Sequence, residues 1–267
     1  MKSVIFVPNL VPRSITMPHN VFGLGDQLKG LIFTYDLCRK HNIDFYVDFR
    51  FHPIGKFVKS QAHPFESEIV ENKIPFIMGK DVEAFILNNG GLICFLTNGI
   101  PHQEITLSES CKEFCKQLLR PINELVDRVE EISSKHNCLK IFHLRFGDKE
   151  CVDHEPQSKE KYLYYINKYK NELKQCNFLM SDSLNFKKLA SQATGIDFLP
   201  HKPQHLGSLS LDHSSIFNDF LDFFLLTRAS FIFSLTSEGH CSSFSLVPSK
   251  IFDIQYRCKT DWKYHMV

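Results

Sequence analysis

The sequence of 267 residues has no excess of charge of either sign and no long apolar run. Its 31 basic and 30 acidic residues give a net charge of +1, which argues against a dedicated nucleic-acid-binding protein. The N-terminal apolar run, about five residues, is shorter than the roughly 7–15 residues of a signal-peptide core. No window approaches the roughly 18 apolar residues of a membrane span. We therefore expect no membrane span and a cytoplasmic location.

The sequence also lacks several patterns that would identify a catalytic or metal site. Its nine cysteines have no zinc-ligand spacing and form no disulfide framework. We interpret them as reduced and mostly buried in a cytosol-like compartment, with a surface cysteine or one regulatory disulfide as the alternatives. The phosphate-binding loop of Walker ATPases, the Gly-x-Ser-x-Gly elbow and His-Glu-x-x-His are all absent, so those three enzyme classes are not indicated.

Apolar and turn residues alternate along the chain in a way that predicts strands separated by helices. This order is typical of α/β folds in which parallel sheets carry helices on both faces. We place a domain boundary near Pro121, which divides the chain into domains 1–121 and 122–267. The predicted strands are 4–7, 45–49, 91–97, 139–146, 177–181, 196–199 and 231–235, and the longer predicted helices are 28–40, 82–88, 108–119, 121–136, 159–173, 184–192 and 215–228.

The stretch Leu139–Glu150 carries the most informative side chains. His143 and Arg145 are two residues apart, so on a strand they leave the same face, near its carboxyl end. In open α/β sheets ligands bind at that end, and a guanidinium can grip a phosphate with a fork of two hydrogen bonds. The alternative is a buried strand with a structural Arg–Asp pair.

Other strand ends and helix starts carry polar residues suited to a nucleotide. Asp182 can accept from ribose hydroxyls or a base, or can be a helix N-cap. Asp222 can accept from a base amino group. Ser242 and Ser243, at a predicted helix start, offer hydroxyls and backbone amides to a phosphate, or are ordinary loop residues. The glycines of Gly23–Gln27, before a predicted helix, also suit an anion, although such a pair is common.

Four segments together resemble a known family. His143-Leu-Arg-Phe-Gly-Asp148 resembles the His-x-Arg-x-Gly-Asp signature of the α-1,2-, α-1,6- and protein O-fucosyltransferase superfamily. Three other segments are similar to motifs of that family, and all four segments stand along the chain in the order found in the family. The three are Gly23–Gln27, Phe178–Ser183, and Leu221–Phe233 continued through Ser242–Ser245. The region between residues 50 and 119 has no match that we can name.

The resemblance implies a GT-B fold, with two Rossmann-like domains whose parallel sheets face a cleft. It implies an inverting, metal-independent glycosyltransferase that moves fucose from GDP-fucose to a glycan hydroxyl and needs no cofactor. The first domain would bind the acceptor and the second the nucleotide sugar. The alternatives are the same fold with another nucleotide-sugar donor, or a non-catalytic nucleotide- or glycan-binding protein.

The resemblance also implies roles for individual residues. Arg145 would hold the β-phosphate and stabilise the leaving GDP. His143 and Asp222 would contact the guanine side, and Ser242 and Ser243 the diphosphate. The full set of implied donor-binding residues is Gly23, Gly25, Gln27, His143, Arg145, Asp148, Asp182, Asp222, Ser242, Ser243 and Phe244.

Two departures from the family pattern affect these roles. Asp26 stands where the family motif has asparagine, and an acid beside a diphosphate repels it unless it is paired or turned away. Asp26 and Glu150 are the candidates for the base that deprotonates the acceptor. The loop before Ser242 is about four residues longer than usual, so the family serine can correspond to Ser237 or to Ser242.

Overall fold

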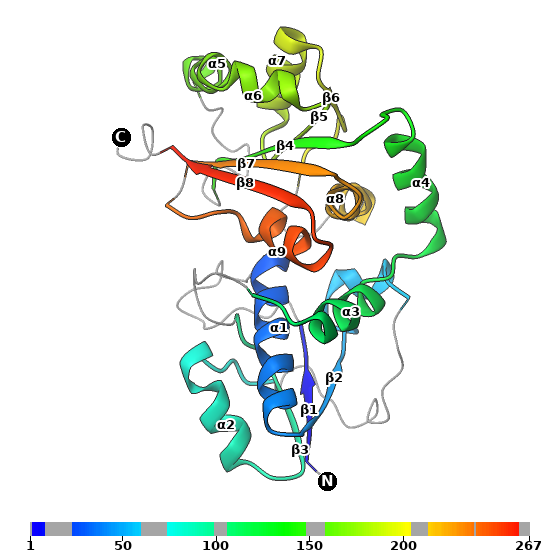
Figure 1. Ribbon diagram of the computed structural model, residues 1–267, viewed down its shortest axis with the longest axis vertical. Coiled ribbons are helices and arrows are strands. Elements are labelled where there is room, and N and C mark those ends of the chain that lie inside the picture. Colours follow the sequence, from blue (N-terminus) through cyan, green and yellow to red (C-terminus); the bar gives the residue numbers. More distant parts are fainter. Residues whose placement is uncertain are drawn as a thin grey trace. The chain divides into compact units, whose positions relative to one another are not determined.

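A computed structural model describes residues 2–8, 23–59, 74–98, 106–147, 158–203, 213–237 and 239–261. The chain divides between Ile122 and Asn123 into two compact units, and each unit contains its own parallel sheet (Figure 1). We call these the N-terminal and C-terminal units. The assignment of the acceptor to one and the nucleotide sugar to the other stays a prediction.

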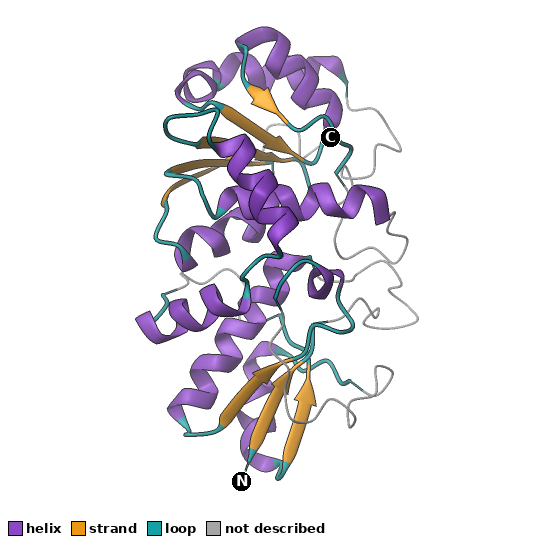
Figure 2. Cartoon of the chain, turned by 90° about the vertical axis from the view of Figure 1, so that its right-hand side faces the viewer, coloured by secondary structure: helices purple, strands orange, loops and turns teal. Residues whose placement is uncertain are grey.

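The N-terminal unit has three parallel strands in the order β2-β1-β3. These strands are drawn in orange near the N-terminus in Figure 2. Helix α1 packs closely on this sheet, because a Cβ on its Gly30 would lie only 1.8 Å from the Thr97 carbonyl oxygen just after β3. Buried apolar residues of β1, β3, α1 and α2 form one core cluster. The elements are β1 (Ser3–Phe6), α1 (Leu24–Lys40), β2 (Asp44–Val47), the 3-10 turns η1 (Pro53–Lys56) and η4 (Gly79–Asp81), α2 (Val82–Asn88), β3 (Leu92–Phe95) and α3 (Glu109–Leu118).

The C-terminal unit has five parallel strands in the order β6-β5-β4-β7-β8. Helices α5, α6 and α7 lie on one face of this sheet, and α8 and α9 on the other (Figure 1). The elements are α4 (Asn123–Ser133), β4 (Lys140–Arg145), α5 (Lys159–Lys168), α6 (Lys170–Gln175), β5 (Phe178–Ser181), α7 (Leu184–Thr194), β6 (Asp197–Phe198), α8 (His213–Leu226), β7 (Phe231–Thr236), α9 (Ser243–Ile251) and β8 (Gln255–Thr260).

The strand order of the C-terminal unit creates a switch point beside β4. From β4 the chain proceeds to β5 and β6 on one side of the sheet, and then crosses to β7 and β8 on the other. The helices that follow β4 and β7, α5 and α9, accordingly lie on opposite faces of the sheet. In open α/β sheets the carboxyl ends of the strands at such a switch point are the usual place for a ligand.

Several predicted boundaries are wrong, and the physical reasons differ. Helix α1 begins at Leu24 and not at residue 28, because the glycine-rich start is already helical. The predicted helix 159–173 is two helices that meet at Tyr169. Strand β8, Gln255–Thr260, was not predicted, because this edge strand consists mostly of polar and charged residues. Among the described residues, no helix is long and apolar enough to cross a membrane.

Candidate functional site

Arg145 is the last residue of the central strand β4, at the switch point. It pairs in register with Thr236 at the end of β7, and the Ser237 amide donates to the Arg145 carbonyl oxygen over 3.1 Å. The Ser237 hydroxyl donates to the Phe146 carbonyl oxygen over 2.6 Å. These bonds fix the backbone on both sides of the switch point, so the half-buried Arg145 side chain leaves from a well-held strand end.

The Asp182 carboxylate, just after β5, holds the turn that follows Arg145. Its oxygens accept from the Phe146 amide at 2.9 Å and the Gly147 amide at 3.2 Å. Gly147 has φ of 111°, which favours glycine at this turn. The prediction of Asp182 as an N-cap is wrong: the N-cap of α7 is Ser183, whose hydroxyl accepts from the Phe186 amide.

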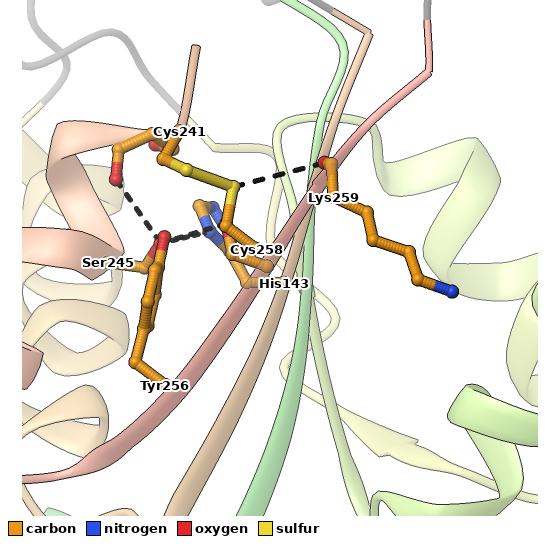
Figure 3. Close-up of a disulfide and its surroundings, with 8 residues drawn as sticks. His143, Cys241, Ser245, Tyr256, Cys258 and Lys259 are labelled. Carbon is orange, nitrogen blue, oxygen red and sulfur yellow. Dashed lines mark hydrogen bonds between the residues drawn. A yellow bond between two sulfur atoms is a disulfide. The ribbon is translucent and has the colours of Figure 1, made fainter. Parts of the chain in front are cut away.

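His143 lies within the unit rather than at its surface. Its side chain is buried, and Nδ1 lies 2.9 Å from the Ser245 hydroxyl of α9 (Figure 3). Burial, together with the nearby Arg145 charge, lowers the pKa of His143 to about 3, so the imidazole is neutral at physiological pH. Its ring also lies 6.0 Å from the ring of Phe244, centroid to centroid. His143 therefore connects β4 to the first turn of α9.

The first turn of α9 presents two of the predicted serines. Ser242 is the N-cap residue, and its carbonyl oxygen accepts from the Leu246 amide over 2.9 Å. Its buried hydroxyl has no hydrogen-bond partner in the described part of the chain. Ser243 is the first residue of the helix. A helix N-terminus with a spare hydroxyl suits an anion.

A disulfide between Cys241 and Cys258 joins this turn to the edge strand β8 (Figure 3). Their Cα atoms are 6.0 Å apart. The prediction that the cysteines are reduced is therefore wrong for this pair, because β8 brings Cys258 beside the start of α9. The same prediction agrees with the structure at Cys38 and Cys176, which are free and buried. Burial raises the pKa of each of these two thiols to about 12.

Asp222 on α8 belongs to a buried ionic cluster that the sequence did not predict. His201 Nε2 lies 3.4 Å from Asp222 Oδ2 and 3.3 Å from Asp219 Oδ1. The buried Lys187 ammonium donates to the His201 carbonyl oxygen over 3.0 Å. Burial raises the pKa of Asp222 and lowers that of His201. The only sequence signal was the pair of aspartates three apart on a mostly apolar helix, which places both on one face.

The glycine-rich segment of the N-terminal unit forms the start of α1. Gly23 is the N-cap residue, so Gly25, Asp26 and Gln27 lie in the first helical turn and not in a loop before it. The Asp26 carboxylate pairs with the Lys29 ammonium at 2.7 Å. The acid is therefore paired, which reduces its repulsion toward a diphosphate.

A buried histidine after β2 was not singled out from the sequence. His52 Nδ1 accepts from the Ile54 amide over 3.1 Å, so in the neutral ring the proton is on Nε2. This Nε2 is buried and has no hydrogen-bond partner among the described residues. Burial lowers the pKa of His52 to about 3.

Asp148 and Glu150 lie outside the described residues. Within the described ranges, no group of three or more His, Cys, Asp or Glu side chains is placed to hold a metal ion.

No protein-family model matches the sequence, and no curated protein is similar to it in sequence. The structure, however, is similar to solved fucosyltransferases. Fucosyltransferase NodZ from Bradyrhizobium is 12% identical, with a TM-score of 0.55 over 92% of each chain. A NodZ α-1,6-fucosyltransferase soaked with GDP-fucose is 11% identical, with a TM-score of 0.56 over 94% of this chain and 93% of that one. A mutant of Arabidopsis thaliana FUT1 in complex with GDP is 11% identical, with a TM-score of 0.55 over 96% of this chain and 70% of that one. At these identities the likeness establishes the fold, so the predicted α/β architecture of the GT-B type, with two Rossmann-like units, is confirmed.

Proposed function

We propose that the chain is an inverting glycosyltransferase that transfers fucose from GDP-fucose to a glycan hydroxyl. One observation carries the proposal: a fixed cation, Arg145, ends the central strand at the switch point of the C-terminal unit. The fold adds support, because similar structures include a NodZ fucosyltransferase soaked with GDP-fucose and an Arabidopsis FUT1 mutant bound to GDP.

The donor diphosphate would lie between Arg145 and the start of α9. The guanidinium would hold the β-phosphate with two hydrogen bonds. The Ser242 hydroxyl, which is buried and has no partner in the described chain, would donate to the diphosphate, and Ser243 would add its hydroxyl and amide. This favours Ser242 over Ser237 as the family serine, because the Ser237 hydroxyl already donates to Phe146.

The nucleoside would extend from the diphosphate toward α8. Phe244 connects the two regions, because its ring lies 6.0 Å from His143 and 5.7 Å from Phe223 of α8. Asp222 precedes Phe223 in the same helix turn and would accept from the guanine. Asp182 would act mainly on the turn after Arg145, and its carboxylate would also accept from the ribose.

The reaction would be a single displacement. The acceptor oxygen forms a bond to the anomeric carbon while the bond from that carbon to the β-phosphate oxygen breaks, and GDP leaves with the electron pair. Arg145 would stabilise the charge that develops on the leaving phosphate. Removal of one such donor typically costs about 100- to 1,000-fold in kcat. The acceptor proton would pass to a base, for which Asp26 is the candidate that the structure describes.

The test is GDP-fucose turnover with a panel of glycan acceptors, compared among the wild type, Arg145→Ala and Arg145→Lys. Loss of at least 100-fold in Arg145→Ala, with partial activity in Arg145→Lys, is expected, since lysine keeps the charge but not the fork. Arg228→Ala is the matched control, because Arg228 is an exposed arginine before the amino end of β7, whereas Arg145 lies at the carboxyl end of the neighbouring strand β4. Turnover that survives Arg145→Ala contradicts the phosphate role.

Ligand binding separates the alternatives. Thermal stabilisation by GDP without turnover of GDP-fucose on any acceptor would indicate a binding protein that kept the fold. Stronger stabilisation by UDP than by GDP would indicate another donor. Loss of turnover in Asp26→Asn with unchanged GDP affinity would support Asp26 as the base.

A further inference from the structure

The buried cluster around Asp222 contains an acceptor that the protein leaves unused. Asp222 Oδ1 has no hydrogen-bond partner among the described residues, and the side chain is only 9% exposed. A buried polar atom without a partner destabilises a fold by about 1–3 kcal/mol, and more when it is charged. Such an atom is retained at a functional site when a ligand supplies the missing donor.

The other oxygen of this carboxylate faces His201. The imidazole Nε2 lies within 3.4 Å of both Asp222 Oδ2 and Asp219 Oδ1, although neither contact is aligned as a hydrogen bond. Burial lowers the pKa of His201, so the ring is neutral at physiological pH and carries one N–H. With its N–H on Nε2, the ring would place a donor beside both carboxylates and restrain Asp222 from one side.

The backbone of His201 is itself fixed. The ammonium of Lys187, a fully buried residue of α7, donates to the His201 carbonyl oxygen over 3.0 Å. His201 follows β6 by three residues, on the carboxyl side of the sheet where Arg145 also lies. The imidazole is therefore held against α8 by a neighbouring helix and a strand end, and not by α8 alone.

A guanine base supplies the donor that the cluster lacks. Its Watson–Crick edge presents a ring N–H beside an exocyclic amino group, which matches the two acceptors of a carboxylate. Adenine presents an acceptor beside its amino group, and hypoxanthine keeps the ring N–H but lacks the amino group. The exocyclic amino group is thus the part of the base that an oriented Asp222 would select.

We infer that His201 is a positioning residue that orients Asp222, so that Oδ1 accepts from the exocyclic amino group of guanine. This inference rests on the proposed function and adds a residue that sets the choice of nucleotide. His201 does not touch the base; it acts through Asp222, and Asp219 is the second carboxylate beside its Nε2.

The test measures dissociation constants of GDP and IDP by calorimetry, since IDP differs by the amino group alone. The wild type should bind GDP about tenfold or more tightly than IDP, as expected for one hydrogen bond to a charged group. In His201→Asn, whose amide nitrogen does not reach the Nε2 position, the GDP:IDP ratio should fall to about threefold or less. His201→Gln, whose amide nitrogen replaces Nε2, should restore the wild-type ratio.

A matched control is His136→Asn, because His136 also lies beside an aspartate, 3.6 Å from Asp197, but at the amino ends of β5 and β6. The GDP:IDP ratio of His136→Asn should equal that of the wild type. If His201→Asn weakens GDP and IDP equally, the residue is merely structural and the inference is overturned.

Two further outcomes separate this inference from the proposed function. Wild-type protein that binds GDP and IDP equally overturns the inference but leaves a GDP-binding protein. Wild-type protein that binds neither overturns both, because the ligand itself is then wrong. His201→Leu is not used, because an apolar side chain would leave the buried carboxylates of Asp219 and Asp222 without a polar group beside them. His201→Asn and His201→Gln both keep a polar side chain and differ in whether its amide nitrogen reaches the Nε2 position.

Discussion

Two buried histidines make the fold sensitive to mild acid. His52 in the N-terminal unit and His143 in the C-terminal unit each have a pKa of about 3 in the folded chain, against an ordinary 6.5. Between these two pH values the unfolded chain binds a proton at each site that the folded chain does not. The free energy of unfolding therefore falls as the pH is lowered from about 6.5 toward 3.

The size of this effect follows from the two pKa values. Each histidine contributes about 1.4 kcal/mol per pH unit, so lowering the pH from 6.5 to 5 removes about 2 kcal/mol per histidine. A folded domain is stable by about 5–15 kcal/mol in total. Asp222 acts in the opposite direction at lower pH, because its raised pKa favours proton uptake by the folded chain below that pKa.

Urea unfolding at pH 7, 6 and 5 measures the effect, with His143→Asn as the variant. The variant removes the titrating group and keeps a polar atom near Ser245. Its stability at pH 7 should be lower than that of the wild type, but its loss on acidification should be smaller, by about 1 kcal/mol between pH 6 and 5 and by less between pH 7 and 6. His41→Asn, at the end of α1, is the control. The reasoning is refuted if His143→Asn and the wild type lose stability with the same dependence on pH.

Two further predictions concern stability. The Cys241–Cys258 disulfide closes a loop with a sequence separation of 17, so Cys241→Ser combined with Cys258→Ser should lower the unfolding free energy by about 3 kcal/mol. A reductant should lower the unfolding free energy of the wild type by a similar amount and leave that of the variant unchanged. Equal unfolding free energies of the two proteins without reductant would contradict a stabilising disulfide. Gly30→Ala should destabilise by about 1–3 kcal/mol, because its Cβ would collide with the Thr97 carbonyl oxygen at 1.8 Å. Gly90→Ala meets nothing within 4 Å and should be neutral, and equal melting temperatures of the two variants would argue against the close packing.

Local patterns predicted the parts of the structure that depend on neighbouring residues. The strand that ends at Arg145 could be read from its apolar alternation and the turn after it, because burial and backbone preference act over a few residues. The α/β class followed in the same way from the order of strands and helices. The position of Arg145 at a switch point required the strand order, which depends on long-range pairing.

The parts that sequence reasoning missed depend on contacts between distant segments. Strand β8 is polar because it is an edge strand, and without it Cys258 could not be placed beside Cys241. His201 approaches Asp219 and Asp222 only because the segment after β6 packs on α8. No residue spacing in the sequence predicts that contact.

The central claim is that Arg145 binds the β-phosphate, and the dissociation constants of GDP and GMP test this claim most directly. Wild-type protein should bind GDP at least tenfold more tightly than GMP, because only GDP offers the β-phosphate to the guanidinium. In Arg145→Ala this ratio should fall to near one, while Arg228→Ala keeps it. A GDP:GMP ratio in Arg145→Ala equal to that of the wild type would contradict the central claim.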